Sequence, residues 1–296
     1  MWADEDVPAW WTGLGLPGLF DVHVHFLPPR MQRSVWAAFD PAGPLIGREW
    51  PIRYRYDEEK RVAVLRELGV RRFSALAYAH RPEMAEPLND WAADFADRTP
   101  GCLRSATFYP EPGVTSYVEA RLRGERGGGV EVFKIHVQVG DFDPNEPALR
   151  EAWGLVADAG VPVVMHVGSG PMPARHTGPD TLARLLRTHP DLTVVVAHLG
   201  SPEYADFLDL ADRHERLLLD TTIAFTDFTE EDAPFPPELR PRLAELEERI
   251  LLGSDFPSIP HPYAHQLEAL ERLGLGDDWL RSVCWGNGAR IFGLGT

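Results

Sequence analysis

Cysteine and long apolar runs are both scarce in this 296-residue sequence. Cys102 and Cys284 are the only cysteines and lie far apart, so no disulfide framework is predicted. No apolar run approaches the roughly 20 residues that a membrane-spanning helix needs. The acidic stretch 1–6 lacks the basic and apolar regions of a secretory signal. Together these absences lead us to expect a reducing, cytoplasmic compartment.

Positive charge is also in short supply, with 29 basic residues against 45 acidic ones and a net charge of −16. This surplus argues against nucleic acid or an anionic membrane surface as a partner. It does not exclude an anionic small molecule, because one arginine or one metal ion can dominate the field inside a pocket. We therefore expect a small-molecule substrate, and a homodimer stays open.

The pattern of apolar segments is that of an α/β protein. Short apolar runs alternate with helical patterns from residue 57 onward, as expected for parallel strands buried on both faces. Eight such strands predict a (β/α)8 TIM barrel with extra C-terminal helices, and a doubly wound open sheet is the alternative. The predicted strands are 20–25, 72–79, 103–108, 130–137, 161–167, 192–197, 216–221 and 250–253.

The chain length suits one domain of this class, so we predict a single domain over residues 1–296. Residues 1–19 are predicted to form an irregular lead-in. Residues 26–56 form an insertion after the first strand, rich in proline and large side chains, which we place near the mouth of the site. Long insertions of this kind are often binding loops or lids, although a merely structural cap would look the same.

The first predicted strand ends in a His-x-His pair. Side chains two residues apart point to the same face of a strand, so His23 and His25 lie on one face and Val22 and Val24 on the other. Two imidazoles at the end of a buried strand can hold one metal ion. Two histidines that merely alternate on a half-buried strand give the same pattern, so the pair needs support from elsewhere in the chain.

That support comes from polar residues at the ends of later strands. Lys134, His166 and His198 are spaced 32 residues apart, close to the period of about 31 residues expected for one strand and helix of a barrel. Asp255 follows the eighth strand. Taken singly, each has a structural explanation. His166 and His198 could be core histidines, Asp255 could cap a turn, and Lys134 could extend from the strand end to solvent. In a closed barrel, however, these strand ends converge on the catalytic face.

Three imidazoles and a carboxylate are a ligand set that suits Zn²⁺, Mn²⁺ or Fe²⁺ and leaves a position for water. A divalent ion lowers the pKa of bound water towards neutrality, and a further histidine can act as general acid or base. The absence of cysteine from the set favours a catalytic site over a structural one.

These residues resemble the amidohydrolase superfamily, and within it the amidohydrolase-related group that includes aminocarboxymuconate-semialdehyde decarboxylase. The resemblance extends roughly over residues 20–294. The segments that carry it are Phe20 to His25, Lys134-Ile135-His136, Val161 to Gly168, Ala197 to Gly200, Gly253 to Pro257, and Asn287 to Leu294.

By position, the resemblance implies that one divalent ion is bound by His23, His25, His166 and Asp255, with zinc expected first and manganese or iron as alternatives. It also implies that His198 activates a water and that Asp255 carries a proton.

Lys134 keeps a second alternative open within this resemblance. In binuclear members a carboxylated lysine at the end of the fourth strand bridges two metals, and the order of ligands here would allow that. The sequence Lys134-Ile135-His136 is more like that of the mononuclear group. We therefore expect one ion, with Lys134 as a further catalytic residue.

We predict a metal-dependent hydrolase that acts on a C–N or C–O bond of a small, carboxylated substrate through a metal-activated water. The alternative is a metal-dependent, non-oxidative decarboxylase of an aromatic or muconate-like acid. A non-catalytic metal-binding barrel is a third reading, opposed by the presence of every expected ligand. The candidate substrate contacts are Arg53, Trp50, Tyr78, Tyr109 and His136, followed by Arg48, Arg175, His80, His176 and His261.

Overall fold

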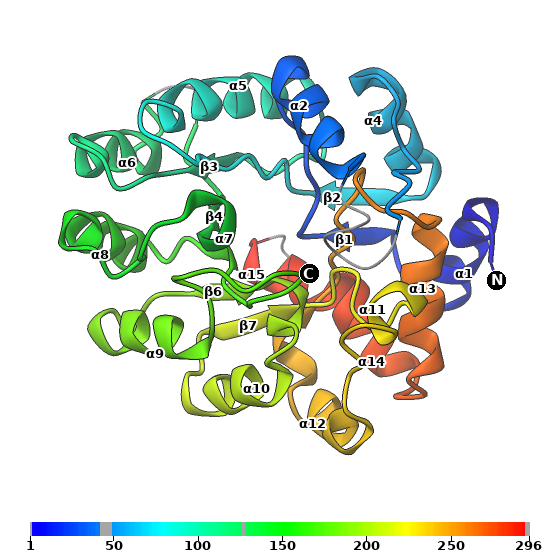
Figure 1. Ribbon diagram of the computed structural model, residues 1–296. Coiled ribbons are helices and arrows are strands. Elements are labelled where there is room, and N and C mark those ends of the chain that lie inside the picture. Colours follow the sequence, from blue (N-terminus) through cyan, green and yellow to red (C-terminus); the bar gives the residue numbers. More distant parts are fainter. Residues whose placement is uncertain (1, 42–48, 126–127, 294–296) are drawn as a thin grey trace. The chain divides into compact units, whose positions relative to one another are not determined.

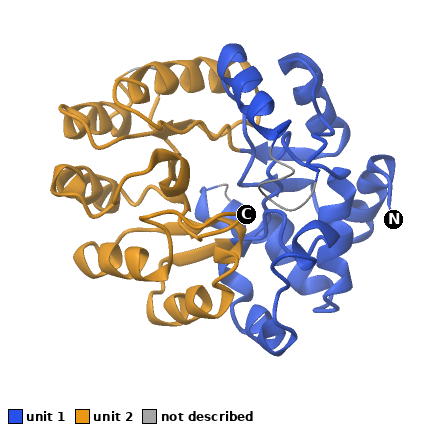
Figure 2. Cartoon of the chain, in the orientation of Figure 1, with its two compact units in different colours: residues 1–73, 220–296 blue, residues 74–219 orange. Residues whose placement is uncertain are grey.

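A computed structural model describes residues 2–41, 49–125 and 128–293. The chain divides into two compact units, drawn in different colours in Figure 2. Unit 1 comprises residues 1–73 and 220–296, and unit 2 comprises residues 74–219. The predicted single domain over the whole chain stays a prediction.

Unit 2 is built on parallel strands that are neighbours in chain order. They are β3 (Ser105–Thr107), β4 (Val132–His136), β5 (Val163–His166), β6 (Val194–Val196) and β7 (Leu217–Asp220), whose last residue belongs to unit 1. The helices of unit 2 line the outer side of these strands in Figure 1. They are α5 (Ala85–Arg98), α6 (Val114–Leu122), α8 (Arg150–Ala159), α9 (Pro179–Thr188) and α10 (Tyr204–Arg213), with the shorter α7 (Val137–Gly140), η2 (Pro147–Leu149) and η3 (Ala197–Gly200).

The strands of unit 2 are buried because both of their faces are apolar. Val163, Val164 and Met165 of β5 are all fully buried. On α9 the buried residues Thr181, Leu182, Leu185 and Leu186 recur at helical spacing and form its inner face. The register between β4 and β5 places His136 directly opposite His166, so two polar side chains end adjacent strands at the same level.

Unit 1 holds the first and last strands of the chain. Strand β1 (Leu19–Asp21) pairs in parallel with β2 (Val70–Phe73), and the amide of Thr221 donates to the carbonyl of Leu251 in β8 (Ile250–Leu251). The helices of the unit are α1 (Val7–Gly13), α2 (Pro29–Phe39), α4 (Glu58–Glu67), α11 (Asp227–Glu230), α12 (Arg240–Glu245), α13 (Tyr263–Arg272), α14 (Asp277–Arg281) and α15 (Asn287–Ile291), with the short turns η1 (Asp4–Asp6), η4 (Pro237–Leu239), η5 (Glu247–Arg249) and η6 (Ser282–Gly286).

Residues at the two ends of α4 show how the local sequence sets the bounds of a helix. Asp57 caps α4 by accepting a hydrogen bond from the amide of Lys60 at 2.8 Å, and Gly69 follows the helix with a φ of +82°. Two predictions in this region were wrong. The lead-in 1–19 contains η1 and α1, because Pro8 favours the first turn of a helix. The strand predicted over 72–79 is β2, Val70–Phe73.

The strand predicted over residues 20–25 also ends early, at Asp21. Beyond Asp21 the backbone bends at Val22 and does not continue the ladder with β2. Val22 donates instead to the carbonyl of Leu252 at 2.9 Å, and His25 donates to that of Phe256 at 2.7 Å. The two histidines therefore lie on an irregular segment that is held by the chain following β8.

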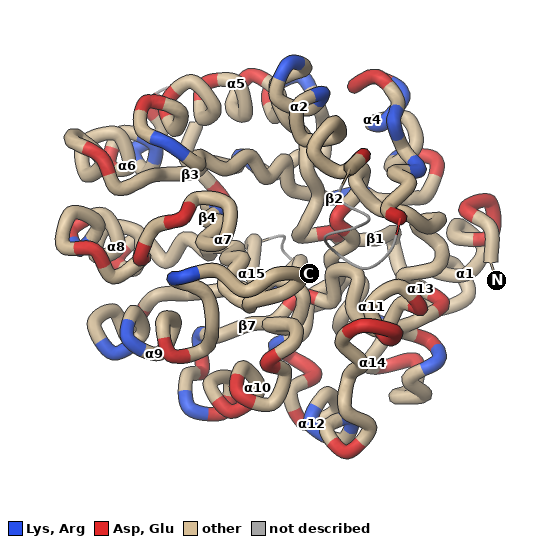
Figure 3. Tube along the Cα trace, in the orientation of Figure 1, with Lys and Arg blue, Asp and Glu red and all other residues tan. Residues whose placement is uncertain are grey.

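The predicted insertion 26–56 begins with α2, and its residues 42–48 lie outside the described part of the chain. Charged residues of both signs recur along the outer helices and loops (Figure 3). Among the described helices, none is long and apolar enough to span a bilayer.

Candidate metal centre and active-site residues

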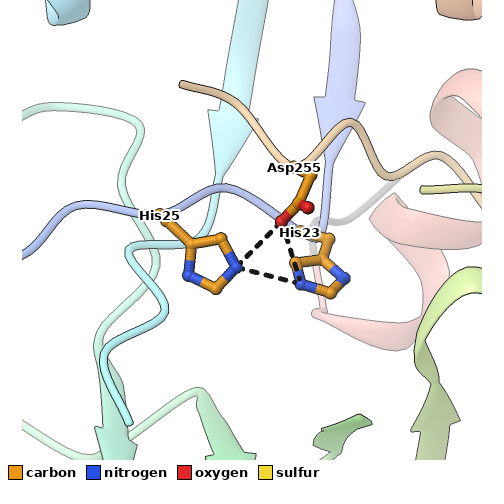
Figure 4. Close-up of side chains that lie close together, drawn as sticks. All are labelled: His23, His25 and Asp255. Atoms are coloured by element: carbon orange, nitrogen blue, oxygen red, sulfur yellow. Dashed lines mark hydrogen bonds and ion pairs between the residues drawn. The ribbon is translucent and has the colours of Figure 1, made fainter. Parts of the chain in front are cut away.

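Three of the predicted ligands lie together in unit 1. The Nε2 atoms of His23 and His25 are 3.2 Å apart, and Asp255 Oδ1 lies 3.0 Å from His25 Nε2 and 3.7 Å from His23 Nε2 (Figure 4). Both histidines are buried, whereas the Asp255 side chain is 20% exposed. The cluster is therefore reached from solvent at its carboxylate.

The spacing of these atoms fits one shared ion. Ligand atoms that each sit about 2.1 Å from the same ion in tetrahedral geometry are about 3 to 3.5 Å from one another. The three separations here run from 3.0 to 3.7 Å. Two imidazoles and a carboxylate are also the donor types that Zn²⁺, Mn²⁺ and Fe²⁺ accept. The residues present thus suit a divalent metal.

A buried carboxylate fixes the orientation of His23. Its Nδ1 lies 2.8 Å from Asp220 Oδ2, and both side chains are almost fully buried. A carboxylate only accepts, so Nδ1 carries the proton and Nε2 presents its lone pair to the cluster. Sequence reasoning missed Asp220. The signal was present, because an acidic residue ends the apolar run Leu217-Leu218-Leu219.

Asp255 is held by its backbone. Its amide donates to the carbonyl of His23 at 2.9 Å, and its φ is +67°, in the left-handed region that non-glycine residues rarely adopt. At Gly253 a Cβ atom would lie 2.1 Å from Thr222 Oγ1 and 2.9 Å from His23 Cβ. Only glycine fits there, so the Gly-Ser-Asp sequence brings the chain close enough to place Asp255 beside the histidines.

A hydrogen-bonded carboxylate lies next to the cluster. Asp21 is fully buried and accepts from Ser254 Oγ at 2.5 Å, Tyr263 OH at 2.9 Å and the amide of His23 at 3.1 Å. Burial raises the pKa of Asp21 to about 7, against the lowering effect of these bonds. Asp21 therefore ties the segment that carries His23 to the segment that carries Asp255.

The same network extends to the N-terminal turn. The amide of Tyr263 donates to the hydroxyl of Tyr54 at 2.6 Å, which donates to Asp4 Oδ2 at 2.5 Å. Asp4 Oδ1 accepts from the amide of Ala264 at 3.0 Å. Asp4 and Tyr54 thus cap the start of α13, whose own N-cap, Pro262, has no side-chain donor or acceptor to offer.

Replacing Asp220 with Asn is expected to weaken metal binding about 10- to 100-fold, because the variant loses the carboxylate that orients His23. Equilibrium dialysis against a competing chelator measures this change. Asp227→Asn is the matched control, since Asp227 is exposed and its side chain pairs with Arg272. Equal metal affinity in the two variants would contradict the orienting role.

The other predicted catalytic residues lie together in unit 2. His198 Nε2 is 3.1 Å from His166 Nδ1, and His166 Nε2 is 3.0 Å from the carbonyl of Gly170. Because that carbonyl only accepts, Nε2 of His166 carries the proton and Nδ1 is its lone-pair nitrogen. The ring of His136 stacks on that of His166 at 4.1 Å and 11°. His198 has a φ of +58°, so its position after β6 is strained.

Of the remaining candidates in unit 2, Tyr78 contacts this histidine group. The Tyr78 ring is 4.9 Å from that of His136, and Lys134 is fully buried one residue before Ile135 in β4. Tyr109 packs edge-on against Phe142 at 5.2 Å, and its hydroxyl donates to the carbonyl of Gly140 at 3.3 Å. Arg175 and His80 are exposed, and His176 is half-buried.

Two predicted substrate contacts lie along the segment that follows Asp255 in unit 1. Trp50 Nε1 donates to the carbonyl of Ser258 at 2.7 Å, and the amide of Arg53 donates to the carbonyl of Ile259 at 2.9 Å. The Trp50 ring also lies 6.1 Å from that of Phe228. Arg48 lies outside the described residues.

His261 is buried between the rings of Phe228, at 5.6 Å, and His265, at 5.1 Å. Burial, with a smaller contribution from His265, lowers the pKa of His261 to about 4. Its bond to the Pro262 carbonyl and the charges of Asp255 and Asp227 act in the opposite direction.

This shift predicts a pH-dependent contribution to stability. Between about pH 6.5 and pH 4 the unfolded chain protonates His261 and the folded chain does not, so the contribution is present above pH 6.5 and is lost on acidification. Over this range we expect the free energy of unfolding of the wild type to fall by on the order of 3 kcal/mol more than that of His261→Gln. Urea unfolding at pH 7 and pH 4.5 measures the difference, with His176→Gln as control. Parallel profiles for the wild type and His261→Gln would contradict it.

The comparison with known families matches residues 20–294 to the family described as amidohydrolase. The chain belongs to the amidohydrolase family. The resemblance carried by its motifs is thereby confirmed, and the protein is an enzyme of the amidohydrolase superfamily. Among curated proteins, no relative matches this amidohydrolase.

Solved structures similar to this amidohydrolase include an uncharacterised TIM-barrel protein from Bordetella bronchiseptica, with a TM-score of 0.71, 19% identity, and coverage of 93% of this chain and 99% of that one. Another is a probable 2-pyrone-4,6-dicarboxylic acid hydrolase from Acinetobacter baumannii with citric acid bound, with a TM-score of 0.61, 15% identity, and coverage of 94% and 100%.

A third is 5-carboxyvanillate decarboxylase from Novosphingobium aromaticivorans, complexed with manganese and 4-hydroxy-3-methoxy-5-nitrobenzoic acid. Its TM-score is 0.63, its identity 13%, and the coverage is 95% of this chain and 97% of that one. At these identities the likeness shows the fold. The predicted (β/α)8 class is confirmed, and the doubly wound sheet is excluded.

Proposed function

We propose that this amidohydrolase is a metal-dependent hydrolase that acts on a small, carboxylated substrate through a metal-activated water. The observation that carries the proposal is the group of His23, His25 and Asp255, with ligand atoms 3.0 to 3.7 Å apart and Nε2 of His23 freed by the bond to Asp220. These three residues would hold the ion, and the ligand role of His166, which lies in unit 2, stays a prediction from the family resemblance. Zinc is the first candidate and manganese the second, and the cytosol is the compartment we propose.

A divalent ion supplies Lewis acidity and a nucleophile at neutral pH when it is bound. The remaining work falls to side chains of this chain. His198 is the proposed proton carrier, and in the structure its Nε2 donates to the lone pair of His166 Nδ1 across 3.1 Å. Asp255 passes a proton towards solvent, because its side chain is the exposed member of the cluster. Trp50 and Arg53 bind the substrate, and the stacked His136 orients His166.

A decarboxylase is the second candidate, and the likeness to 5-carboxyvanillate decarboxylase favours it. In that reading the substrate is an aromatic or muconate-like acid, and a histidine delivers a proton to the carbon that loses CO₂. The same side chains serve both reactions, so the bond that is broken distinguishes them.

A panel of lactones, amides and aromatic carboxylates, assayed with the metal-loaded enzyme in H₂¹⁸O, tests the proposal. A hydrolase incorporates one ¹⁸O atom into the product and releases no CO₂. Release of CO₂ with deuterium incorporated at the ring carbon in D₂O would establish the decarboxylase instead. The same assays on enzyme stripped of metal are expected to show no turnover, and full turnover without metal would contradict both readings.

A further inference from the structure

Unit 1 contains a buried guanidinium that forms no direct ion pair with a described residue, although the charges of Glu58 and Asp57 raise its pKa against the lowering effect of burial. Arg61 on α4 is 3% exposed. Its Nη1 donates to Gln32 Oε1 at 2.7 Å, and its Nε lies 3.4 Å from the carbonyl of Asp57. The guanidinium carbon lies over the ring of Phe26 at 4.9 Å and that of Trp36 at 5.4 Å. A buried cation is normally paired with an anion, because leaving water costs it free energy.

Two more donors accompany this cation. Gln32 Nε2 and Trp36 Nε1 are both buried, and neither has a hydrogen-bond partner among the described residues. Gln32 and Trp36 are four residues apart on α2 and therefore lie on the same face of that helix. Both also contact Arg61. Two buried N–H donors, Gln32 Nε2 and Trp36 Nε1, thus lie beside the guanidinium without an acceptor among the described residues.

We infer that Arg61, Gln32 and Trp36 form a carboxylate-binding site. A carboxylate supplies the missing charge, and its two oxygens in one plane match the fork of a guanidinium. An amide and an indole N–H offer further hydrogen bonds, and the rings of Phe26 and Trp36 form apolar walls. In a chain of net charge −16, such a cation is a local exception that favours an anion.

We assign the site to the carboxylate of the substrate, because it is built on the chain that follows the His-x-His segment. Phe26, which Arg61 covers, directly follows the metal-ligand candidate His25 in the chain. Helix α2 belongs to the insertion that follows the His-x-His segment. This identification of the occupant rests on the proposed function, whereas the existence of a carboxylate site does not. A free carboxylate acting as an effector has the same chemistry and is distinguished by the experiment.

Benzoate is the probe, and its binding to the metal-free protein is measured by calorimetry and by the shift of the unfolding midpoint. We expect benzoate to bind the wild type and to raise its unfolding midpoint. Arg61→Met is expected to lose at least tenfold in benzoate affinity. Trp36→Phe, which removes the indole N–H and reduces the size of the ring, is expected to lose a few-fold. Arg66→Met is the matched control, because Arg66 is exposed on the same helix, and it should bind benzoate like the wild type.

A purely structural Arg61 predicts a different pattern. In that case Arg61→Met lowers the unfolding midpoint without benzoate, and benzoate affinity is the same in every folded variant. That result, or no benzoate response in the wild type, overturns the site. If Arg61→Met does not fold, Trp36→Phe and Gln32→Leu test the site instead. A loss of benzoate affinity in either variant supports the site, and unchanged affinity in both overturns it.

Steady-state kinetics then separate the two sources of carboxylate. If the substrate occupies the site, benzoate inhibits competitively and Trp36→Phe raises KM with little change in kcat. Non-competitive inhibition would overturn the assignment to the substrate in favour of an effector. Because benzoate binding is measured without metal or turnover, failure of the proposed function leaves that result unaffected.

Discussion

Replacing His198 with Asn is expected to lower kcat about 10²- to 10⁴-fold while metal content stays at the wild-type level. The magnitude is the usual contribution of a general acid or base. His198 Nε2 faces His166 Nδ1 at 3.1 Å, and the strained backbone at φ +58° holds it there. Asparagine keeps a polar side chain and tolerates this conformation, but it cannot exchange a proton near neutral pH.

The control for this variant is His189→Asn, since His189 follows the last turn of α9 and is not among the candidate site residues. Turnover is measured on whichever substrate the panel identifies, and metal is measured by elemental analysis of the same samples. Turnover within a few-fold of wild type for His198→Asn would remove the proposed role of His198. Loss of metal together with turnover would make His198 a ligand, as the binuclear alternative requires.

Replacing His25 with Ala is expected to weaken metal binding more than about 100-fold, beyond the range seen for residues that only support a ligand. The variant removes the imidazole that lies within 3.2 Å of both other members of the cluster. Turnover should fall to background in both the hydrolase and the decarboxylase readings. Chelator competition measures the affinity, and addition of excess metal should restore little activity.

The His25→Ala variant must also be folded for the result to count. Its circular dichroism and unfolding midpoint should match those of metal-free wild type, because the backbone bond from His25 to Phe256 does not need the side chain. His189→Ala is the matched control, with metal affinity and turnover unchanged. Wild-type metal affinity in His25→Ala would exclude this cluster as the metal centre.

The side chains that cluster in unit 1 could be predicted from the sequence where residue type and position alone identify a possible metal ligand. The His-x-His pair and Asp255 were recognisable from residue type and position, and the structure brings their ligand atoms together. The bond between His23 and Asp220 joins residues 197 positions apart, so neither periodicity nor spacing could identify it. The same holds for the contacts that link Asp4 and Tyr54 to the start of α13.

The ends of helices and strands were predicted wrongly where tertiary contacts outweigh the local sequence pattern. Residues 22–25 read as strand, yet their hydrogen bonds go to the chain after β8, which ends the ladder at Asp21. Residues 237–248 do not form one helix but are divided into η4, α12 and η5, because Pro241 can occupy only the first turn of a helix. Helix α1 is too short for an amphipathic pattern to emerge, and it is docked by the bond from Trp11 Nε1 to the Leu68 carbonyl.

The metal content of the purified wild-type protein tests the central claim most directly. After dialysis against excess Zn²⁺ or Mn²⁺ and removal of free metal, elemental analysis is expected to find one ion per chain in the wild type and almost none in His25→Ala. A wild type that retains no ion would contradict the metal centre itself. Two ions per chain would contradict the mononuclear account and give Lys134 the bridging role of the alternative.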